Sequence, residues 1–147
     1  MTESLGVLIG DVSHLIRKRF DERARMIGAT RAQWKTLLTL SRNPGTSQGA
    51  LAERLEVEPI TAGRMIDRLE ESGLVERRRD PADRRVWRIH PTAAATPVLA
   101  RLRGYADDLF GEAVDGLSLD EQAELARLLQ HVRDNLSQSD AKEAVHG

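Results

Sequence analysis

The residues with the clearest chemical potential lie in the segment 77–88, which reads RRRDPADRRVWR. It contains six arginines and two aspartates, although the whole chain has a net charge of −1 at pH 7. The planar guanidinium group of arginine binds phosphate and base edges. Asp-Pro-Ala-Asp at 80–83 has the composition of a turn, which predicts a hairpin with Arg84 and Arg85 near its tip and Arg78 on a strand. We expect these three side chains to contact the minor groove or the phosphate backbone of DNA, with the second aspartate of the turn holding one arginine in place.

A second set of polar and small residues lies near the start of a helix predicted over residues 59–72. An α-helix fits the major groove of B-DNA, and its base-contacting residues lie early in the helix on the face away from the protein core. Five residues are expected to meet these conditions: Thr61, Ala62, Gly63, Arg64 and Arg68. We expect Arg64 to hydrogen-bond guanine, Thr61 to contact a base edge or a thymine methyl group, and Arg68 to bind a phosphate. The two small residues are expected to permit close approach to the DNA.

Two helices across a short turn position these residues. Apolar spacing predicts the first helix over residues 47–55, and the second begins with Pro59 at a favourable first position and ends at Gly73, a typical C-terminal cap. We expect the second helix to turn four apolar side chains inward: Ile60, Met65, Ile66 and Leu69. The two helices form a helix-turn-helix, and the hairpin that follows is its wing.

Apolar residues also recur at helical spacing toward both ends of the chain, over residues 4–28 and 93–137. Either Thr92 or Thr96 is expected to cap the first helix of the second stretch, and Ser-Leu-Asp-Glu at 118–121 has a capping-box pattern for its last helix. A small winged unit would not cover the apolar faces of these helices. We therefore expect them to form a dimerisation domain.

The predicted fold class is mostly α-helical with a small β-hairpin wing. At 147 residues the chain is expected to be a single domain. Its winged helix-turn-helix is expected over about residues 31–92, because Thr30 suits the N-cap of a further helix, which Asn-Pro-Gly at 43–45 ends.

The composition argues against several functional classes. The chain has no cysteine, which removes disulfides, thiol chemistry and zinc sites that need sulfur. None of the four histidines has the spacing with Ser, Asp or Glu typical of a catalytic triad, and no glycine-rich phosphate loop occurs. We therefore expect no enzymatic activity, no cofactor and no metal. No apolar run is long enough to span a membrane and no signal peptide is visible, so we expect a cytoplasmic protein without a membrane partner.

Three other interpretations stay open at this point. Arg64 and Arg68 have the spacing to pair with Asp67 and Glu71 on a solvated helix, which is the ordinary role of such charges. A metal-responsive regulator would need a cluster of His and carboxylate ligands, although no H-x3-H pair occurs. An architectural protein would bind DNA regardless of its sequence. The arginine-rich hairpin beside a helix-turn-helix favours specific DNA binding.

The order of these elements and their residues over 51–92 resemble the multiple antibiotic resistance regulator (MarR) family. The matching pieces are Leu-Ala-x-x-Leu from Leu51, the segment 61–69, Leu-Glu-x-x-Gly-Leu-Val-x-Arg at 69–77, and Asp-Arg-Arg at 83–85. The pair Gln33-Trp34 resembles the sequence of the SlyA-like branch of the family. One departure is His-Pro-Thr at 90–92, where a leucine usually precedes the threonine.

The resemblance implies a transcriptional regulator that works as a homodimer through its N- and C-terminal helices. Two-fold symmetry then predicts a palindromic operator in double-stranded DNA. The resemblance also implies a repressor that is released by a small aromatic or phenolic anion. Candidate residues for such a ligand are His14 and Arg17 on the first helix and Trp34 on the second. The ordinary roles of these residues are an interface histidine, a surface charge and a core tryptophan.

Overall fold

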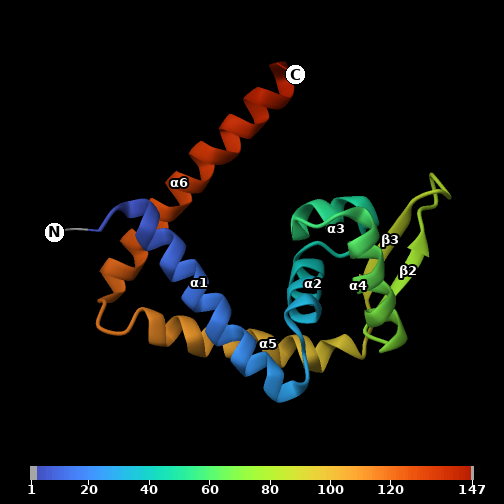
Figure 1. Ribbon diagram of the computed structural model, residues 1–147, viewed down its shortest axis with the longest axis horizontal. Helices are drawn as coiled ribbons and strands as arrows, with labels where there is room; N and C mark the ends of the chain where they lie inside the picture. The colour runs from blue at the N-terminus through green and yellow to red at the C-terminus, as the bar shows by residue number, and fades with distance from the viewer. Residues whose placement is uncertain (1–2, 147) are drawn as a thin grey trace. The chain divides into compact units, whose positions relative to one another are not determined.

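The computed structural model describes residues 3–146 of the chain, and the side chains of residues 3–138. The chain divides between Leu109 and Phe110 into two compact units, and each is described by itself. Figure 1 shows the elements, which in chain order are α1 (Leu5–Ala24), a 3₁₀ helix (Arg25–Ile27), α2 (Arg31–Arg42), β1 (Thr46–Ser47), α3 (Gln48–Leu55), α4 (Pro59–Glu71), β2 (Val75–Arg79), β3 (Trp87–Pro91), α5 (Ala95–Ala113) and α6 (Leu119–His146). This mostly helical architecture with a small antiparallel sheet confirms the predicted fold class.

Local capping chemistry sets the helix boundaries of the first unit. Gly28 adopts a left-handed conformation after the 3₁₀ helix, with φ of 73°, and Thr30 and Gln33 form a reciprocal capping box at the start of α2. The hydroxyl of Ser47 accepts a hydrogen bond from the Ala50 amide at the start of α3. Pro59 occupies the first turn of α4, as predicted, and Gly73 follows its end with φ of 76°.

The sheet has three antiparallel strands in the order β1-β3-β2. The predicted hairpin between β2 and β3 is present, and its register places Arg78 opposite Arg88 and Arg79 opposite Trp87. The short strand β1 is not predicted, because two residues are too few to show strand periodicity. It adds to the outer side of β3, where Thr46 pairs with Ile89. This pairing ties the start of α3 to the wing.

Two groups of buried side chains form the core of the first unit. One group joins α2, α3, α4, the sheet and α5, and it contains Leu37, Leu40, Leu51, Leu55, Ile66, Leu69, Val75, Ile89, Ala95 and Leu99. The other joins α1, α2 and α5, and it contains Phe20, Ala24, Ala29, Trp34, Leu102 and Leu109. The recognition helix candidate α4 is therefore held on one face only, and its other face is exposed.

The prediction that Ile60 turns inward is wrong. Its side chain is 69% exposed, whereas Ala62 is fully buried. Ala62, Ile66 and Leu69 recur at steps of four and three, which is the spacing of one helix face. The buried face of α4 therefore begins at the smaller residue.

The start of α5 differs from both predicted positions. The helix begins at Ala95, so Thr96 lies inside it, and Thr92 precedes it by a short turn. The Thr92 hydroxyl donates a hydrogen bond of 2.5 Å to the Gly73 carbonyl, and the Thr92 carbonyl accepts a hydrogen bond from the Ala95 amide at 3.1 Å. Thr92 thus joins the end of α4 to the start of α5 instead of capping the helix with its side chain.

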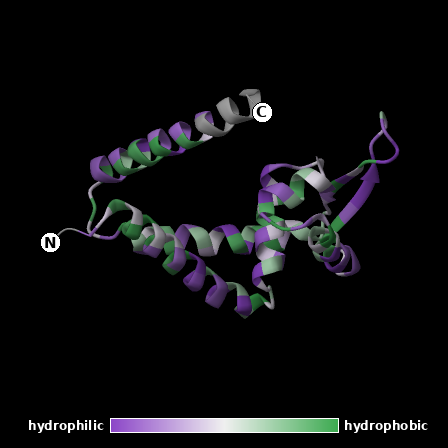
Figure 2. Ribbon diagram, turned by 45° about the horizontal axis from the view of Figure 1, so that its top comes forward, coloured by the Kyte–Doolittle hydropathy of each residue, from purple (hydrophilic) through white to green (hydrophobic). Residues whose placement is uncertain are grey.

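The second unit consists of the end of α5 and the long helix α6. The predicted capping box is confirmed, because the Ser118 hydroxyl accepts the Glu121 amide at 3.1 Å and the Glu121 carboxylate accepts the Ser118 amide at 2.9 Å. Apolar side chains along α6 are exposed to solvent within the described chain. The ribbon of Figure 2, coloured by hydropathy, shows hydrophobic and hydrophilic residues interspersed along this helix. None of the helices in the described part of the chain has the length and apolarity needed to cross a membrane.

Candidate nucleic-acid interface

The exposed face of α4 carries three of the five side chains predicted to meet DNA. Thr61, Arg64 and Arg68 are exposed. The prediction that Ala62 faces DNA is wrong, because this residue is fully buried in the protein core. Gly63 is half-buried, and a Cβ atom at this position would lie 3.3 Å from the Gln48 side chain of α3. The small residues at these two positions serve close packing between helices.

The two arginines of α4 are available for ligands. Among the residues that the structure describes, neither Arg64 nor Arg68 forms a side-chain hydrogen bond or an ion pair. The alternative interpretation pairs them with Asp67 and Glu71 on their own helix. Asp67 instead forms an ion pair of 2.6 Å with Arg77 of β2. The solvated-helix interpretation of Arg64 and Arg68 is therefore not supported by the geometry.

Arg77 fastens the wing to the helix-turn-helix. Its guanidinium donates to the Gly63 carbonyl of α4 at 3.1 Å, to the Gln48 side chain of α3 at 3.2 Å and to Glu70 of α4 at 3.2 Å. The Arg77 amide also donates to Glu70, at 3.3 Å. Only 15% of the Arg77 side chain is exposed, and its contacts fix the position of β2 against α4.

Two further wing arginines stabilise the hairpin itself. The Arg79 guanidinium stacks over the Trp87 ring at 3.8 Å and donates to the Arg84 carbonyl at 2.5 Å. Arg88 donates to the Asp80 carboxylate at 2.8 Å. Asp80 also accepts the Ala82 amide at 2.7 Å, and the hydrogen bonds from this amide and from Arg88 hold the pKa of Asp80 below its ordinary value. The turn is thus shaped by polar contacts before any ligand binds.

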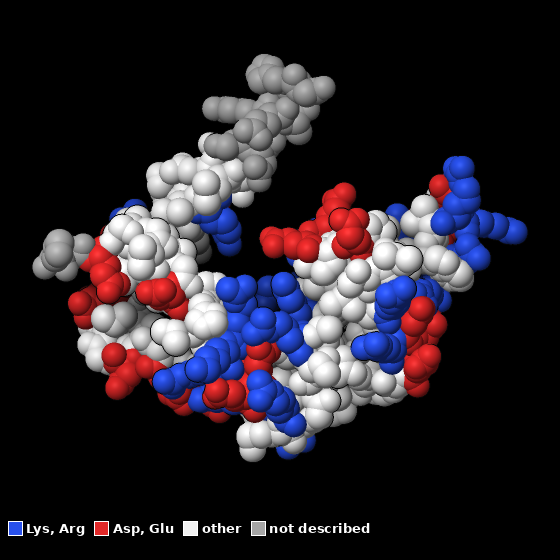
Figure 3. Space-filling view, in the orientation of Figure 1, with Lys and Arg blue, Asp and Glu red and all other residues white. Residues whose placement is uncertain are grey.

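Arg84 and Arg85 lie at the tip of the wing, and both are exposed. The Asp83 carboxylate accepts the Arg85 amide at 3.1 Å and its Nε at 3.2 Å, which confirms the predicted role of this aspartate. Within the described chain the Arg84 guanidinium has no hydrogen bond or ion pair. Arg78, the third predicted wing contact, pairs with the neighbouring Glu76. Figure 3 shows the resulting concentration of basic side chains at the end of the wing.

The three residues suggested for a ligand differ in exposure. His14 and Arg17 are exposed on α1. Trp34 is buried on α2, where its ring lies 4.5 Å from that of Phe20 and its indole N–H donates to Asp21 at 2.7 Å. The polar end of the indole is therefore already satisfied within the protein.

Asp21 links α1 to α2 through this tryptophan and through Arg31, whose Nε donates to it at 2.8 Å. Burial alone would raise the pKa of Asp21, but the hydrogen bonds from Arg31 and Trp34 outweigh this effect and hold the pKa below its ordinary value. The carboxylate stays charged at neutral pH and fixes the junction between the two helices.

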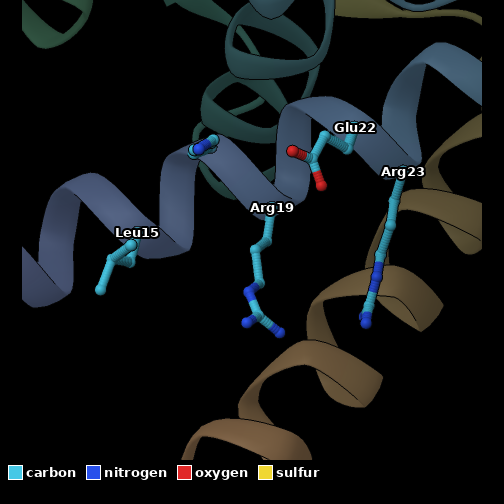
Figure 4. Close-up of a pocket in the computed structure, with 5 residues that line it drawn as sticks. Leu15, Arg19, Glu22 and Arg23 are labelled. Carbon is cyan, nitrogen blue, oxygen red and sulfur yellow. The ribbon is translucent and has the colours of Figure 1, made fainter.

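A basic cavity on α1 is absent from the sequence-based predictions. It has a volume of about 350 Å³ and is lined by Leu15, Lys18, Arg19, Glu22 and Arg23. Figure 4 shows Arg19 and Arg23 extending from the same side of the helix, and Arg23 donates to the Tyr105 carbonyl of α5 at 3.3 Å. Residues four apart lie on one helix face, so the spacing of Arg19 and Arg23 already indicates a shared basic face in the sequence.

The described residues offer no set of metal ligands that would support a metal-responsive regulator. No three His, Cys, Asp or Glu side chains of the described residues lie close enough together to hold a metal ion.

Comparison with known proteins agrees with this geometry. The MarR family model matches residues 29–87, which include the helix-turn-helix and most of the wing. Three solved structures illustrate the similarity along the chain. A mutant of MarR from E. coli in complex with operator DNA is 29% identical, with a TM-score of 0.72 over 87% of this chain and 92% of that one. The transcriptional regulator SlyA is 28% identical, with a TM-score of 0.79 over 93% of this chain and 96% of that one. The transcriptional regulator PA3341 is 31% identical, with a TM-score of 0.80 over 92% of this chain and 99% of that one.

These matches extend beyond the DNA-binding unit to nearly the whole length of each related chain. The chain belongs to the MarR family of DNA-binding transcriptional regulators.

Proposed function

We propose that this protein is a homodimeric repressor that recognises a palindromic operator. In this proposal α4 enters the major groove and the tip of the wing contacts the minor groove or the phosphate backbone. The observation that carries it is the contrast among the arginines. Arg77 holds the wing against α4, whereas the guanidinium groups of Arg64, Arg68 and Arg84 are exposed and unpaired within the described chain. Exposed arginines on a fixed framework suit bidentate contacts to guanine and contacts to phosphate.

The dimer rests on apolar surface that this single chain does not cover. On α1 the exposed apolar side chains include Leu8, Val12 and Leu15. On α6 they include Leu125, Leu128, Leu129, Val132 and Leu136. We assign the winged helix-turn-helix to about residues 31–92 and dimerisation to the helices in about 4–28 and 93–137. Burial of these faces between two copies would remove apolar area from water and would set two recognition helices on one side of the DNA.

We also propose that a small aromatic or phenolic anion releases the repressor from its operator. The support for this release is the family resemblance and the basic character of α1. A ligand that used the Trp34 ring as a wall would displace it from Phe20 and from Asp21, so binding there would carry the cost of those contacts. Such a ligand weakens operator binding only to the extent that it prefers the form of the dimer that does not fit DNA. The coupling free energy between two such sites is typically about 1–3 kcal/mol.

The test begins with selection of bound sites from a random pool of double-stranded DNA, which identifies the operator. Arg64→Ala and Thr61→Ala are then expected to lose about 1–3 kcal/mol of binding free energy at particular base pairs and to relax the preference there. Arg84→Ala is expected to weaken binding to every sequence and to reduce the slope of the salt dependence by about one for each phosphate contact that the substitution removes.

Arg127→Ala is the matched control, since it removes one arginine of α6 that pairs with Glu124 of the same helix. Its binding is expected to equal that of the wild type. Equal affinity of the wild type for the selected site and for random DNA would instead establish a sequence-blind architectural protein. Operator binding that a chelator abolishes would establish a metal-responsive regulator.

A further inference from the structure

One apolar side chain stands out in the DNA-binding part of the chain. All of residues 31–109 are described, and within them Ile60 is the one large hydrophobic side chain that is exposed. The other exposed large hydrophobic residues lie on α1, at Met26, or from Phe110 onward. The packing of the core does not need Ile60, because the buried face of α4 begins at Ala62.

The position of Ile60 places it beside the predicted DNA contacts. It is the second residue of α4, it directly precedes Thr61, and it lies one turn before Arg64. Residues four apart share a helix face, so the isoleucine and the arginine lie one above the other on the exposed side. In a helix that enters the major groove, the N-terminal residues approach the base edges most closely.

The chemistry of an isoleucine at this point restricts what it can recognise. Its side chain has no hydrogen-bond donor or acceptor, so it cannot bind a phosphate or a polar base edge. The apolar group that the major groove presents is the C5-methyl group of thymine, and apolar side chains distinguish thymine by contact with it. Contact with this methyl group removes apolar surface of both partners from water.

We propose that Ile60 reads a thymine in each operator half-site by packing against its C5-methyl group. This inference rests on the proposed function, since it requires α4 to lie in the major groove. It adds an apolar determinant to the polar contacts expected of Thr61 and Arg64. The half-site is then expected to contain a thymine next to the base pair that Arg64 reads.

The test replaces each thymine of the selected operator, one at a time, with deoxyuridine, which removes only the methyl group. For the wild type we expect a loss of affinity of about fourfold at one thymine of a half-site, because removal of the methyl group forfeits the favourable burial of about one methyl group. Ile60→Ala is expected to bind the thymine and uracil operators equally at that position. Ile60→Val, which keeps a branched apolar side chain, is expected to retain most of the discrimination.

Thr61→Ser is the matched control, because it removes the other methyl group near the start of α4 and keeps the hydroxyl. This variant is expected to lose affinity, as the wild type does, when the critical thymine is replaced with deoxyuridine. The proposal is overturned if no thymine is sensitive to loss of its methyl group, or if the sensitivity persists in Ile60→Ala. Disappearance of the sensitivity in Thr61→Ser as well would assign the methyl contact to the threonine. Either result leaves the proposed function intact when an operator has been selected. If the wild type selects no sequence, the proposed function itself fails.

Because Ile60 is exposed, its substitutions are expected to leave the thermal unfolding temperature of the free protein unchanged. Measurement of that temperature for each variant separates a loss of discrimination from a loss of folded protein. A variant that discriminates less at full stability supports direct contact with the base.

Discussion

Replacing Arg77 with alanine should destabilise the protein and weaken its DNA binding at the same time. The substitution removes the hydrogen bonds to the Gly63 carbonyl and to Gln48, as well as the ion pairs with Asp67 and Glu70. These partners lie on α3 and α4, whereas Arg77 lies on β2. The wing is therefore no longer held at a fixed position beside the recognition helix candidate.

The size of the effect follows from the burial of each partner. The side chains of Asp67 and Glu70 are 59% and 44% exposed, so each of their ion pairs contributes only about 0–1 kcal/mol. The hydrogen bonds to Gly63 and Gln48 are partly buried and have a charged donor, for which about 1.5–3 kcal/mol each is typical. Solvent replaces part of this contribution after truncation. We expect a total loss of about 2–4 kcal/mol in the free energy of unfolding.

The assay is urea unfolding at a fixed protein concentration, because the stability of a dimer depends on concentration. Arg78→Ala is the control, since its exposed side chain pairs with the adjacent Glu76, and a change of less than about 0.5 kcal/mol is expected. Arg77→Lys keeps one charge but cannot reproduce the planar set of donors, so it should recover only part of the stability. Equal stabilities of Arg77→Ala and Arg78→Ala would refute the reasoning.

Three further predictions concern other parts of the chain. Because the pKa of Asp21 is held below its ordinary value, its charged form contributes stability above that value, and the contribution disappears as the pH falls through the pKa of the folded state. Asp21→Asn should therefore lower the free energy of unfolding at neutral pH and reduce its decline in acid, as urea titrations across that pH range will measure. Replacing Leu128 and Val132 with aspartate should place charges in the proposed dimer interface and give monomer or unfolded chain in equilibrium sedimentation, and a well-folded wild-type monomer at micromolar concentration would contradict the dimer. In Trp87→Phe the remaining Trp34 emission should respond to salicylate-like compounds at millimolar concentration, whereas in Trp34→Phe the emission of Trp87 should respond chiefly to DNA. If neither the Trp34 signal nor operator affinity changes, no such ligand acts at this site.

Features set by neighbouring residues could be predicted from the sequence. The Thr30 N-cap, the Ser118 capping box and the left-handed Gly73 each depend on side chains or backbone within a few positions. The partners of the wing arginines could not be predicted in this way. Arg77 binds residues up to 29 positions away, and which arginine reaches them depends on how β2 packs against α3 and α4.

The incorrect assignment of Ile60 and Ala62 has a different cause. The spacing of Ile66 and Leu69 already indicates a buried face that continues back to Ala62, but the apolar character of isoleucine favours burial. Ala62 is fully buried, and at the neighbouring Gly63 a Cβ atom would lie 3.3 Å from the Gln48 side chain of α3. The two helices approach closely here, and helix phase decides the buried face more reliably than residue size.

Among the arginines between residues 64 and 88, two contrasting physical groups can be distinguished. One group, which includes Arg77, is anchored within the protein, and the other, which includes Arg64 and Arg84, is exposed and unpaired within the described chain. Truncation of an anchored arginine should reduce stability and weaken binding to all DNA sequences, because it moves the framework. Truncation of an unpaired arginine should leave stability unchanged and weaken binding only because one direct interaction with DNA is removed. Paired measurements of unfolding and DNA affinity thus assign each arginine to the framework or to the interface without a structure of the complex.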